Sequence, residues 1–115
     1  MNTFSRDSRV RTQREFAAVY ASGIYAADHL LVINALPRSD ERCRLGLSIS
    51  KKVGNAVVRN RWKRLIRESF RCAKEKLPPG WDLVIRPKRG GQPDRFQIER
   101  SLLNLMRRLE QRRPG

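Results

Sequence analysis

The segment between Lys51 and Lys76 constrains the fold most strongly, because winding it into a helix separates apolar from basic side chains. Successive residues of an α-helix are rotated by about 100°, so the residues that share a face can be read from the sequence. One arc is apolar or small and predicts a helix that packs on a core. It contains Val58, Trp62, Leu65, Ile66, Ser69, Phe70 and Ala73.

The opposite arc of the same helix is basic. From Lys51 to Lys76 there are ten basic residues and only two acids, Glu68 and Glu75. Solvated helix faces usually mix both signs, whereas like charges at this density repel one another. A polyanion would relieve that repulsion, so the pattern favours contact with RNA or DNA over a merely solvated face. The arc contains Arg59, Lys63, Arg64, Arg67, Arg71 and Lys74, with Arg61 at its edge.

The whole chain shares this basic character. It has 115 residues, a formal net charge of +15 and an isoelectric point near 11.4, as expected of a protein that binds a polyanion. The length permits one domain, residues 1–115, with a modest core. No apolar stretch approaches the roughly 20 residues of a membrane span, and the N-terminus lacks the apolar core of a signal peptide. We therefore expect a cytoplasmic protein that does not enter membranes.

The remaining patterns predict a small α+β domain. Thr12 and Glu15 form a capping-box pattern that opens a helix reaching about Ala21, with Gly23 as its C-terminal stop. Strands are expected at 30–36, 42–50 and 81–86, with a possible shorter one near 24–26. The order is α, two or three β, α, β, α, with helices packed on a sheet.

Caps and breaks define the other boundaries. Asn55 is predicted to cap the basic helix, which runs to about Lys76, and Asp94 is predicted to cap a last helix. The apolar stripe of that last helix is assigned to the core: Ile98, Leu102, Leu105, Met106 and Leu109. Residues 1–11 are interpreted as a basic arm, and residues 107–115 as a basic, frayed tail.

Residues 42–50 alternate in polarity. Cys43, Leu45, Leu47 and Ile49 are predicted to face the core. The other side, formed by Arg44, Gly46, Ser48 and Ser50, is mostly small and polar, and predicts a shallow floor that can receive a ligand.

No catalytic set is evident in the sequence. The 11 acids include no close carboxylate pair of the kind that holds Mg²⁺ in two-metal nucleases. His29 is the only histidine and is assigned a structural role. Cys43 and Cys72 have neither a metal-binding nor a disulfide-framework spacing, and are interpreted as small residues at the edge of the core. The chain is therefore predicted to bind, not to cut.

The segment from Ser50 to Glu68, with its Arg-Asn-Arg-x-Lys-Arg-x-x-Arg spacing, closely resembles the RNR signature of the bacterial ribonuclease P protein subunit. Residues 15–23, 44–50 and 77–87 resemble further parts of that family, and the likeness covers roughly 9–110. It implies an αβββαβα sandwich in which the signature helix makes a left-handed crossover between parallel strands. General rules alone predict a right-handed crossover.

The resemblance also implies a function. In this family the RNA subunit positions Mg²⁺ and removes the 5′ leader of precursor tRNA, while the protein binds both RNAs. Mg²⁺ is then held mainly by the RNA subunit, with none bound by the protein alone and no obligate protein partner. The residues implied to bind the RNA subunit are Arg59, Arg61, Lys63, Arg64 and Arg67, together with Arg9 and Arg11 of the N-terminal arm.

A second implied surface is a cleft for the leader between the first helix and the sheet. Phe16 and Tyr20 would stack on unpaired bases, which tolerates many sequences. Asn34 stands where the family commonly has an aromatic residue, and suggests a hydrogen bond instead. The basic loop at Lys88-Arg89 is expected to approach RNA. The rest of the implied cleft comprises Val32 and Ser48 on the floor with Asn34, and Lys52, Ala56, Arg59 and Asn60 on one wall.

Three other functions share features with this one. A ribosomal or ribosome-assembly protein has similar composition but does not need an aromatic cleft for a variable single strand. A sequence-reading DNA-binding protein would place a short helix, not a strand, before its recognition helix. A protein-only nuclease would need the acid cluster that this chain lacks.

Overall fold

The computed structural model describes residues 9–88, 92 and 94–114, and within them the elements follow the order αβββαβα. This order confirms the one implied by the family resemblance, including the short strand near residue 24. The elements are α1 (Gln13–Ser22), β1 (Ile24–Ala27), β2 (Leu31–Pro37), β3 (Cys43–Leu47), α2 (Ala56–Ala73), β4 (Trp81–Pro87) and α3 (Arg95–Gln111), with 3₁₀ turns η2 (Lys51–Val53) and η3 (Lys74–Lys76).

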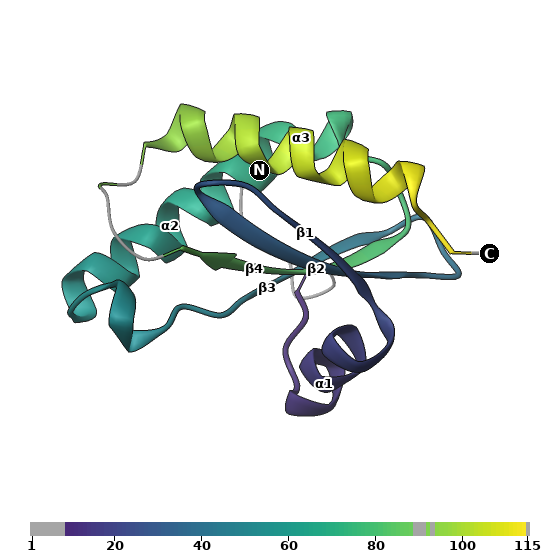
Figure 1. Cartoon of the computed structure of the whole chain (residues 1–115), viewed down its shortest axis with the longest axis horizontal. Coiled ribbons are helices and arrows are strands. Elements are labelled where there is room, and N and C mark those ends of the chain that lie inside the picture. The colour runs from purple at the N-terminus through teal and green to yellow at the C-terminus, as the bar shows by residue number, and fades with distance from the viewer. Residues whose placement is uncertain (1–8, 89–91, 93, 115) are drawn as a thin grey trace.

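The four strands form one mixed sheet in the order β1-β2-β4-β3. β1 pairs with β2 and β2 with β4 in antiparallel fashion, whereas β3 and β4 are parallel neighbours. The basic helix α2 connects this parallel pair, as expected; the hand of the crossover stays a prediction. α2 and α3 cover one face of the sheet, and α1 lies against the other (Figure 1).

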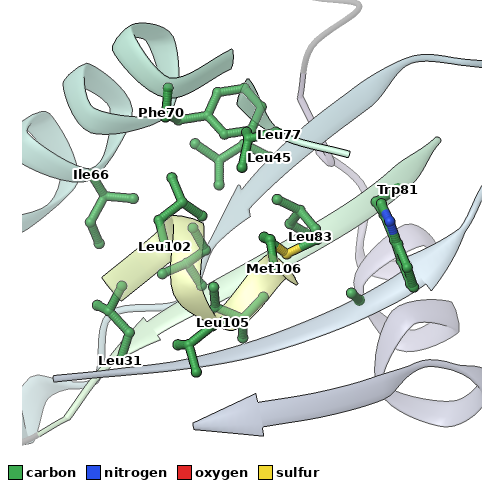
Figure 2. Packing of buried hydrophobic residues seen from close by; sticks show 14 of the residues in the cluster. Leu31, Leu45, Ile66, Phe70, Leu77, Trp81, Leu83, Leu102, Leu105 and Met106 are labelled. Atoms are coloured by element: carbon green, nitrogen blue, oxygen red, sulfur yellow. The ribbon is translucent and has the colours of Figure 1, made fainter. Parts of the chain in front are cut away.

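The core lies between the sheet and the α2–α3 layer. Ile66 and Phe70 of α2 approach side chains of α3, among them Leu102, and side chains of the strands below (Figure 2). Trp62 is fully buried, which confirms its assignment to the core. The stripe predicted for α3 is buried as well: Ile98, Leu102, Leu105, Met106 and Leu109.

The predicted helix caps are confirmed. The Thr12 hydroxyl accepts from the Glu15 amide while the Glu15 carboxylate accepts from the Thr12 amide, so both halves of the capping box are present. Asn55 accepts from the Val58 amide at the start of α2. Asp94 accepts from two amides at the start of α3. Each cap satisfies amide groups that lack a partner within their helix.

Gly23 follows α1 as predicted, but for a different physical reason. Its φ is −85°, so the left-handed conformation that makes glycine a common helix stop is not used here. A Cβ atom at this position would instead collide with the carbonyl oxygens of Val19 and Ala35. Glycine is required because α1 and β2 approach each other closely.

Several boundaries differ from the predictions. β3 ends at Leu47, not at residue 50, because Ser50 already caps the η2 turn by accepting from the Lys52 amide. α2 ends at Ala73, and the last turn to Lys76 is 3₁₀. Cys43 is buried as expected, whereas Cys72 is exposed and does not line the core. No helix within the described residues is long and apolar enough to cross a membrane.

The two basic ends are more ordered than the sequence predicted, where the structure describes them. The Val10 amide donates to the Leu45 carbonyl at 3.0 Å and Val10 is buried, so residues 9 and 10 lie against β3. At the other end, the Arg113 guanidinium donates to the carbonyl of Pro79 and lies 4.3 Å from the centre of the Trp81 ring. The predicted frayed tail is therefore wrong for residues 107 to 113. Arm residues 1–8 lie outside the described residues.

Candidate nucleic-acid interface

The five α2 cations predicted to bind RNA are Arg59, Arg61, Lys63, Arg64 and Arg67. No side chain of this group forms a hydrogen bond or ion pair with another described residue. The acid within the same helix, Glu68, pairs instead with Arg71. α2 thus carries a run of positive charge that its described surroundings do not neutralise.

Part of this charge lines a hollow that we call the Phe16 hollow. It lies where the N-terminal segment, α1, β3 and α2 meet, so two cations of α2 share a cavity with the first predicted stacking residue. A Cβ atom on Gly46 would come within 2.9 Å of the Phe16 ring, so a glycine is needed beneath this aromatic. The hollow is lined by Arg9, Val10, Phe16, Leu45, Gly46, Leu47, Lys63 and Arg67.

Two other cations of α2, Arg61 and Arg64, line a separate surface, the Arg61 groove. It is formed by Val57, Asn60, Arg61 and Arg64. Asn60 was predicted to line the leader cleft, whereas Lys63 and Arg67 were predicted to bind the RNA subunit. In space, Asn60 shares a groove with Arg61 and Arg64, while Lys63 and Arg67 lie beside Phe16. The two surfaces therefore each combine residues predicted to bind the RNA subunit with residues predicted to bind the leader. The role of each residue stays a prediction.

The floor predicted for the cleft faces α1. Val32 and Asn34 alternate with the buried Leu31, Ile33 and Ala35 of β2, so both point away from the main core. Tyr20 of α1 is 43% exposed, and its ring centre lies 5.8 Å from the guanidinium carbon of Arg86. Asn34 accepts a hydrogen bond within the protein, from Nη2 of Arg86 at 3.1 Å. The hydrogen bond that the sequence suggested, in place of a stacking contact with the leader, stays a prediction.

Other predicted contact residues lie at the rim. Ser48 is half-buried just after β3, where its amide donates to the Ile85 carbonyl at 3.1 Å. Lys52 in the η2 turn and Ala56 at the start of α2 are exposed. Arg11 is exposed at the entrance to α1, and Lys88 is exposed at the end of β4. Arg89 lies outside the described residues.

An ion-pair network holds α1 on the sheet. Arg44 donates through Nε and Nη2 to both oxygens of Asp82, at 2.8 and 2.9 Å, and through Nη1 to Glu15 at 2.8 Å. Arg38 adds a second contact to Asp82 at 3.0 Å. Asp82 is only 7% exposed, so its charge needs these partners. The network fixes the helix that carries Phe16 and Tyr20.

The same contacts shift the acid–base behaviour of this network. Backbone hydrogen bonds from Thr12 and Arg11, reinforced by Arg44, lower the pKa of the Glu15 carboxyl to about 2 from its usual 4.5. Hydrogen bonding to Asp82, together with Glu15, raises the pKa of Arg44 above its usual value. Both groups are therefore fully charged at neutral pH.

Two residues of this surface, Arg86 and Tyr25, were missed by the sequence reasoning. Arg86 lies on the α1-facing side of β4, and every other residue of that strand is buried, so no alternation marked its face. Tyr25 is 62% exposed and opposite Asn34 in the β1–β2 register. β1 has only four residues, so its sequence is too short for an alternation that would mark the face of Tyr25.

The described residues contain no group of three or more His, Cys, Asp or Glu side chains that could hold a metal ion. Several of their acids serve instead as helix caps or in ion pairs, such as Asp94 at α3 and Asp82 at Arg44. The chemistry available on this surface is therefore that of charge, hydrogen bonding and stacking.

Comparisons with known proteins agree with this arrangement. The family model described as Ribonuclease P matches residues 4–110. The ribonuclease P protein component of Desulfovibrio desulfuricans is 42% identical over 96% of this chain and 88% of its own length. That of Clostridioides difficile is 37% identical over 93% of this chain and 96% of its own length.

Solved structures give the same answer for the fold. The Thermotoga maritima RNase P protein has a TM-score of 0.80 and 30% identity, covering 87% of this chain and 96% of that one. A Staphylococcus aureus RNase P protein has a TM-score of 0.76 and 30% identity, covering 87% of this chain and 93% of that one. On the family match, the sequence identities and the shared fold, this chain belongs to the family of ribonuclease P protein components.

Proposed function

We propose that this chain binds the RNA subunit of ribonuclease P and the 5′ leader of precursor tRNA, and so assists leader removal during tRNA 5′-end maturation. Family membership supports a place in ribonuclease P and in tRNA processing. The division of labour proposed for the protein goes further: it contributes binding surfaces, while the RNA subunit cuts and holds most of the Mg²⁺.

The observation that carries the proposal is the set of five α2 cations without partners among the described residues. A guanidinium can bind a phosphate through two parallel hydrogen bonds, which suits arginine to an RNA backbone. Neutralising phosphates also releases counterions, so such contacts should make binding strongly salt-dependent. We assign the RNA subunit to this helix, beginning with the exposed Arg61 and Arg64 of the Arg61 groove.

The leader is assigned to the α1-facing side of the sheet. Phe16 and Tyr20 offer aromatic surface to single-stranded bases without demanding a sequence. The Phe16 hollow brings Lys63 and Arg67 next to this aromatic surface, so one strand of RNA there can contact both bases and phosphates. In this proposal the leader and the RNA subunit occupy adjoining surfaces of the protein, and α2 contributes cations to both.

The proposal is tested by measuring how the reconstituted RNA–protein complex binds precursor tRNA with a leader and mature tRNA without one. We expect the protein to strengthen binding of the leader-bearing RNA more than that of the mature RNA. Replacing Phe16 by Ala should remove most of this preference, about tenfold in affinity, since stacking on an aromatic contributes about 1–3 kcal/mol per base.

Phe96 provides the matched control, because it is also aromatic but lies exposed on α3, on the opposite side of the sheet. Phe96→Ala should leave the preference for the leader unchanged. If the protein strengthens binding of both RNAs equally, or if the two variants behave alike, the assigned leader cleft is wrong.

A further inference from the structure

A half-buried arginine on the α1-facing side of the sheet has no acidic partner. Arg86 sits opposite Val32, and the only hydrogen bond that its side chain makes with another described residue goes to Asn34. Its Nε atom is buried and makes no hydrogen bond. Withdrawing a guanidinium from water without an anion beside it is unfavourable. The position is therefore suited to receive an anionic group from a ligand.

The Arg86 guanidinium is also held in place. The Tyr20 ring lies beside it, at 5.8 Å from the guanidinium carbon, and Asn34 fixes Nη2. Arginine has five N–H groups, so the bond to Asn34 leaves others for a ligand. Because the side chain is ordered before binding, less conformational entropy is lost when a ligand arrives.

An exposed aromatic residue lies beside this pair. Tyr25 is directly opposite Asn34, and side chains directly opposite in an antiparallel pair share a face of the sheet. It is 62% exposed on the edge strand β1. An aromatic ring in that position can stack on an unpaired base. Asn34 itself occupies the place where the family resemblance implies an aromatic residue.

We propose that Tyr25, Asn34 and Arg86 form a nucleotide subsite for single-stranded RNA, in which Arg86 binds a backbone phosphate and Tyr25 stacks on an adjacent base. The Asn34 oxygen accepts from Arg86, which leaves its amide nitrogen free to donate to the edge of the base. The subsite extends the RNA surface to edge strand β1, beyond Tyr20. It rests on the proposed function, because the RNA that reaches it is the leader.

A neutral backbone linkage tests this subsite directly. Precursor tRNAs would carry one uncharged methylphosphonate at successive leader positions, and each would be bound to the complex reconstituted from the RNA subunit and the full chain. With the unaltered protein, one position should lose about tenfold in affinity, as expected for a charge-assisted contact. The complex with Arg86→Gln should bind unmodified RNA about tenfold more weakly. A methylphosphonate at that same position should then cause no further loss of affinity.

Matched variants separate the subsite from general effects. Arg100 is exposed on α3, so Arg100→Gln removes the same charge outside the cleft and should change neither measurement. Tyr25→Leu should weaken leader binding several-fold, whereas Phe96→Leu should not. Thermal unfolding of each variant reports whether it folds. If Arg86→Gln does not fold, the methylphosphonate scan with the unaltered protein still tests the subsite.

The outcomes are distinct. If the unaltered complex shows no preference for leader-bearing RNA, the proposed function fails and the subsite fails with it. If that preference is present but the Arg86→Gln complex shows the same linkage sensitivity as the unaltered one, the leader cleft stands and the subsite alone is overturned. A scan of the unaltered complex with no sensitive position also overturns the subsite.

Discussion

Two groups of basic side chains in this molecule behave in opposite ways. Around the sheet and at the C-terminus, arginines are bound internally: Arg44 to Asp82 and Glu15, and Arg112 to the Tyr25 carbonyl. On α2, the five cations of the signature have no partner among the described residues. Each cation of either group adds one charge to the formal net charge of +15, but of these two groups only the second has side chains that are not bound to other described residues.

The difference shows why net charge alone does not locate a binding surface. Arg108 and Arg112 donate to carbonyl groups of edge strand β1, at 3.3 and 2.8 Å, so their charge also covers a strand edge that could otherwise pair with another chain. The α2 cations do nothing comparable for the fold. We infer that the first group stabilises the fold, and we propose that the second binds RNA.

The largest expected effect comes from breaking the internal group. Arg44→Ala leaves Asp82 with Arg38 alone and frees Glu15, so the free energy of unfolding should fall by about 2–3 kcal/mol. Urea unfolding measures it. Arg64→Ala, a matched change on α2, should stay within about 0.5 kcal/mol of the unaltered protein. Equal losses would contradict the division into two groups.

The next effect concerns RNA binding. The Arg61→Ala/Arg64→Ala double variant should bind the RNA subunit at least about tenfold more weakly, and the slope of log affinity against log salt should shrink by about 2. Arg108→Ala/Arg112→Ala removes the same charge from the internal group and should change the slope little. Titration at several salt concentrations measures both. If the two double variants had similar salt slopes, the loss of affinity would depend on the number of charges removed and not on their position in the protein.

The smallest effect is a pH dependence in the internal group. Because the pKa of folded Glu15 is about 2, below its usual 4.5, its contribution to stability is complete above 4.5 and is lost as pH falls towards 2. Glu15→Gln should therefore cost about 1 kcal/mol of unfolding free energy at pH 7. The difference in unfolding free energy between the unaltered protein and Glu15→Gln should shrink as the pH falls. A difference that stays constant down to pH 2 would show that it does not come from the ionised Glu15 carboxylate.

The second group was visible in the sequence, whereas the internal bonding of the first group was not. The apolar arc of α2 and the caps at Thr12, Asn55 and Asp94 depend on local spacing, which periodicity and side-chain chemistry reveal directly. The basic arc followed from the same periodicity. The three caps are confirmed, and the apolar arc packs on the core, although Val58 and Leu65 are only partly buried.

The structural features that were not predicted depend on contacts between residues far apart in the sequence. Arg113 reaches the carbonyl of Pro79 across 34 positions, so its tail was predicted to fray. The faces of β4 could not be distinguished because both are covered, which hid Arg86. Which α2 cations join Phe16 depends on how β3 and α1 meet that helix, so the Phe16 hollow appeared only with the fold.

The most direct measurement is leader removal from precursor tRNA at low Mg²⁺, with the RNA subunit alone, the RNA subunit with this chain, and the chain alone. We expect weak cleavage by the RNA, strong stimulation by the chain, and no cleavage by the chain alone. The Arg61→Ala/Arg64→Ala variant should stimulate cleavage by the RNA subunit only at a higher protein concentration than the unaltered chain needs. Absence of stimulation, or cleavage by the chain without RNA, would contradict the view that this protein holds RNA so that RNA can cut.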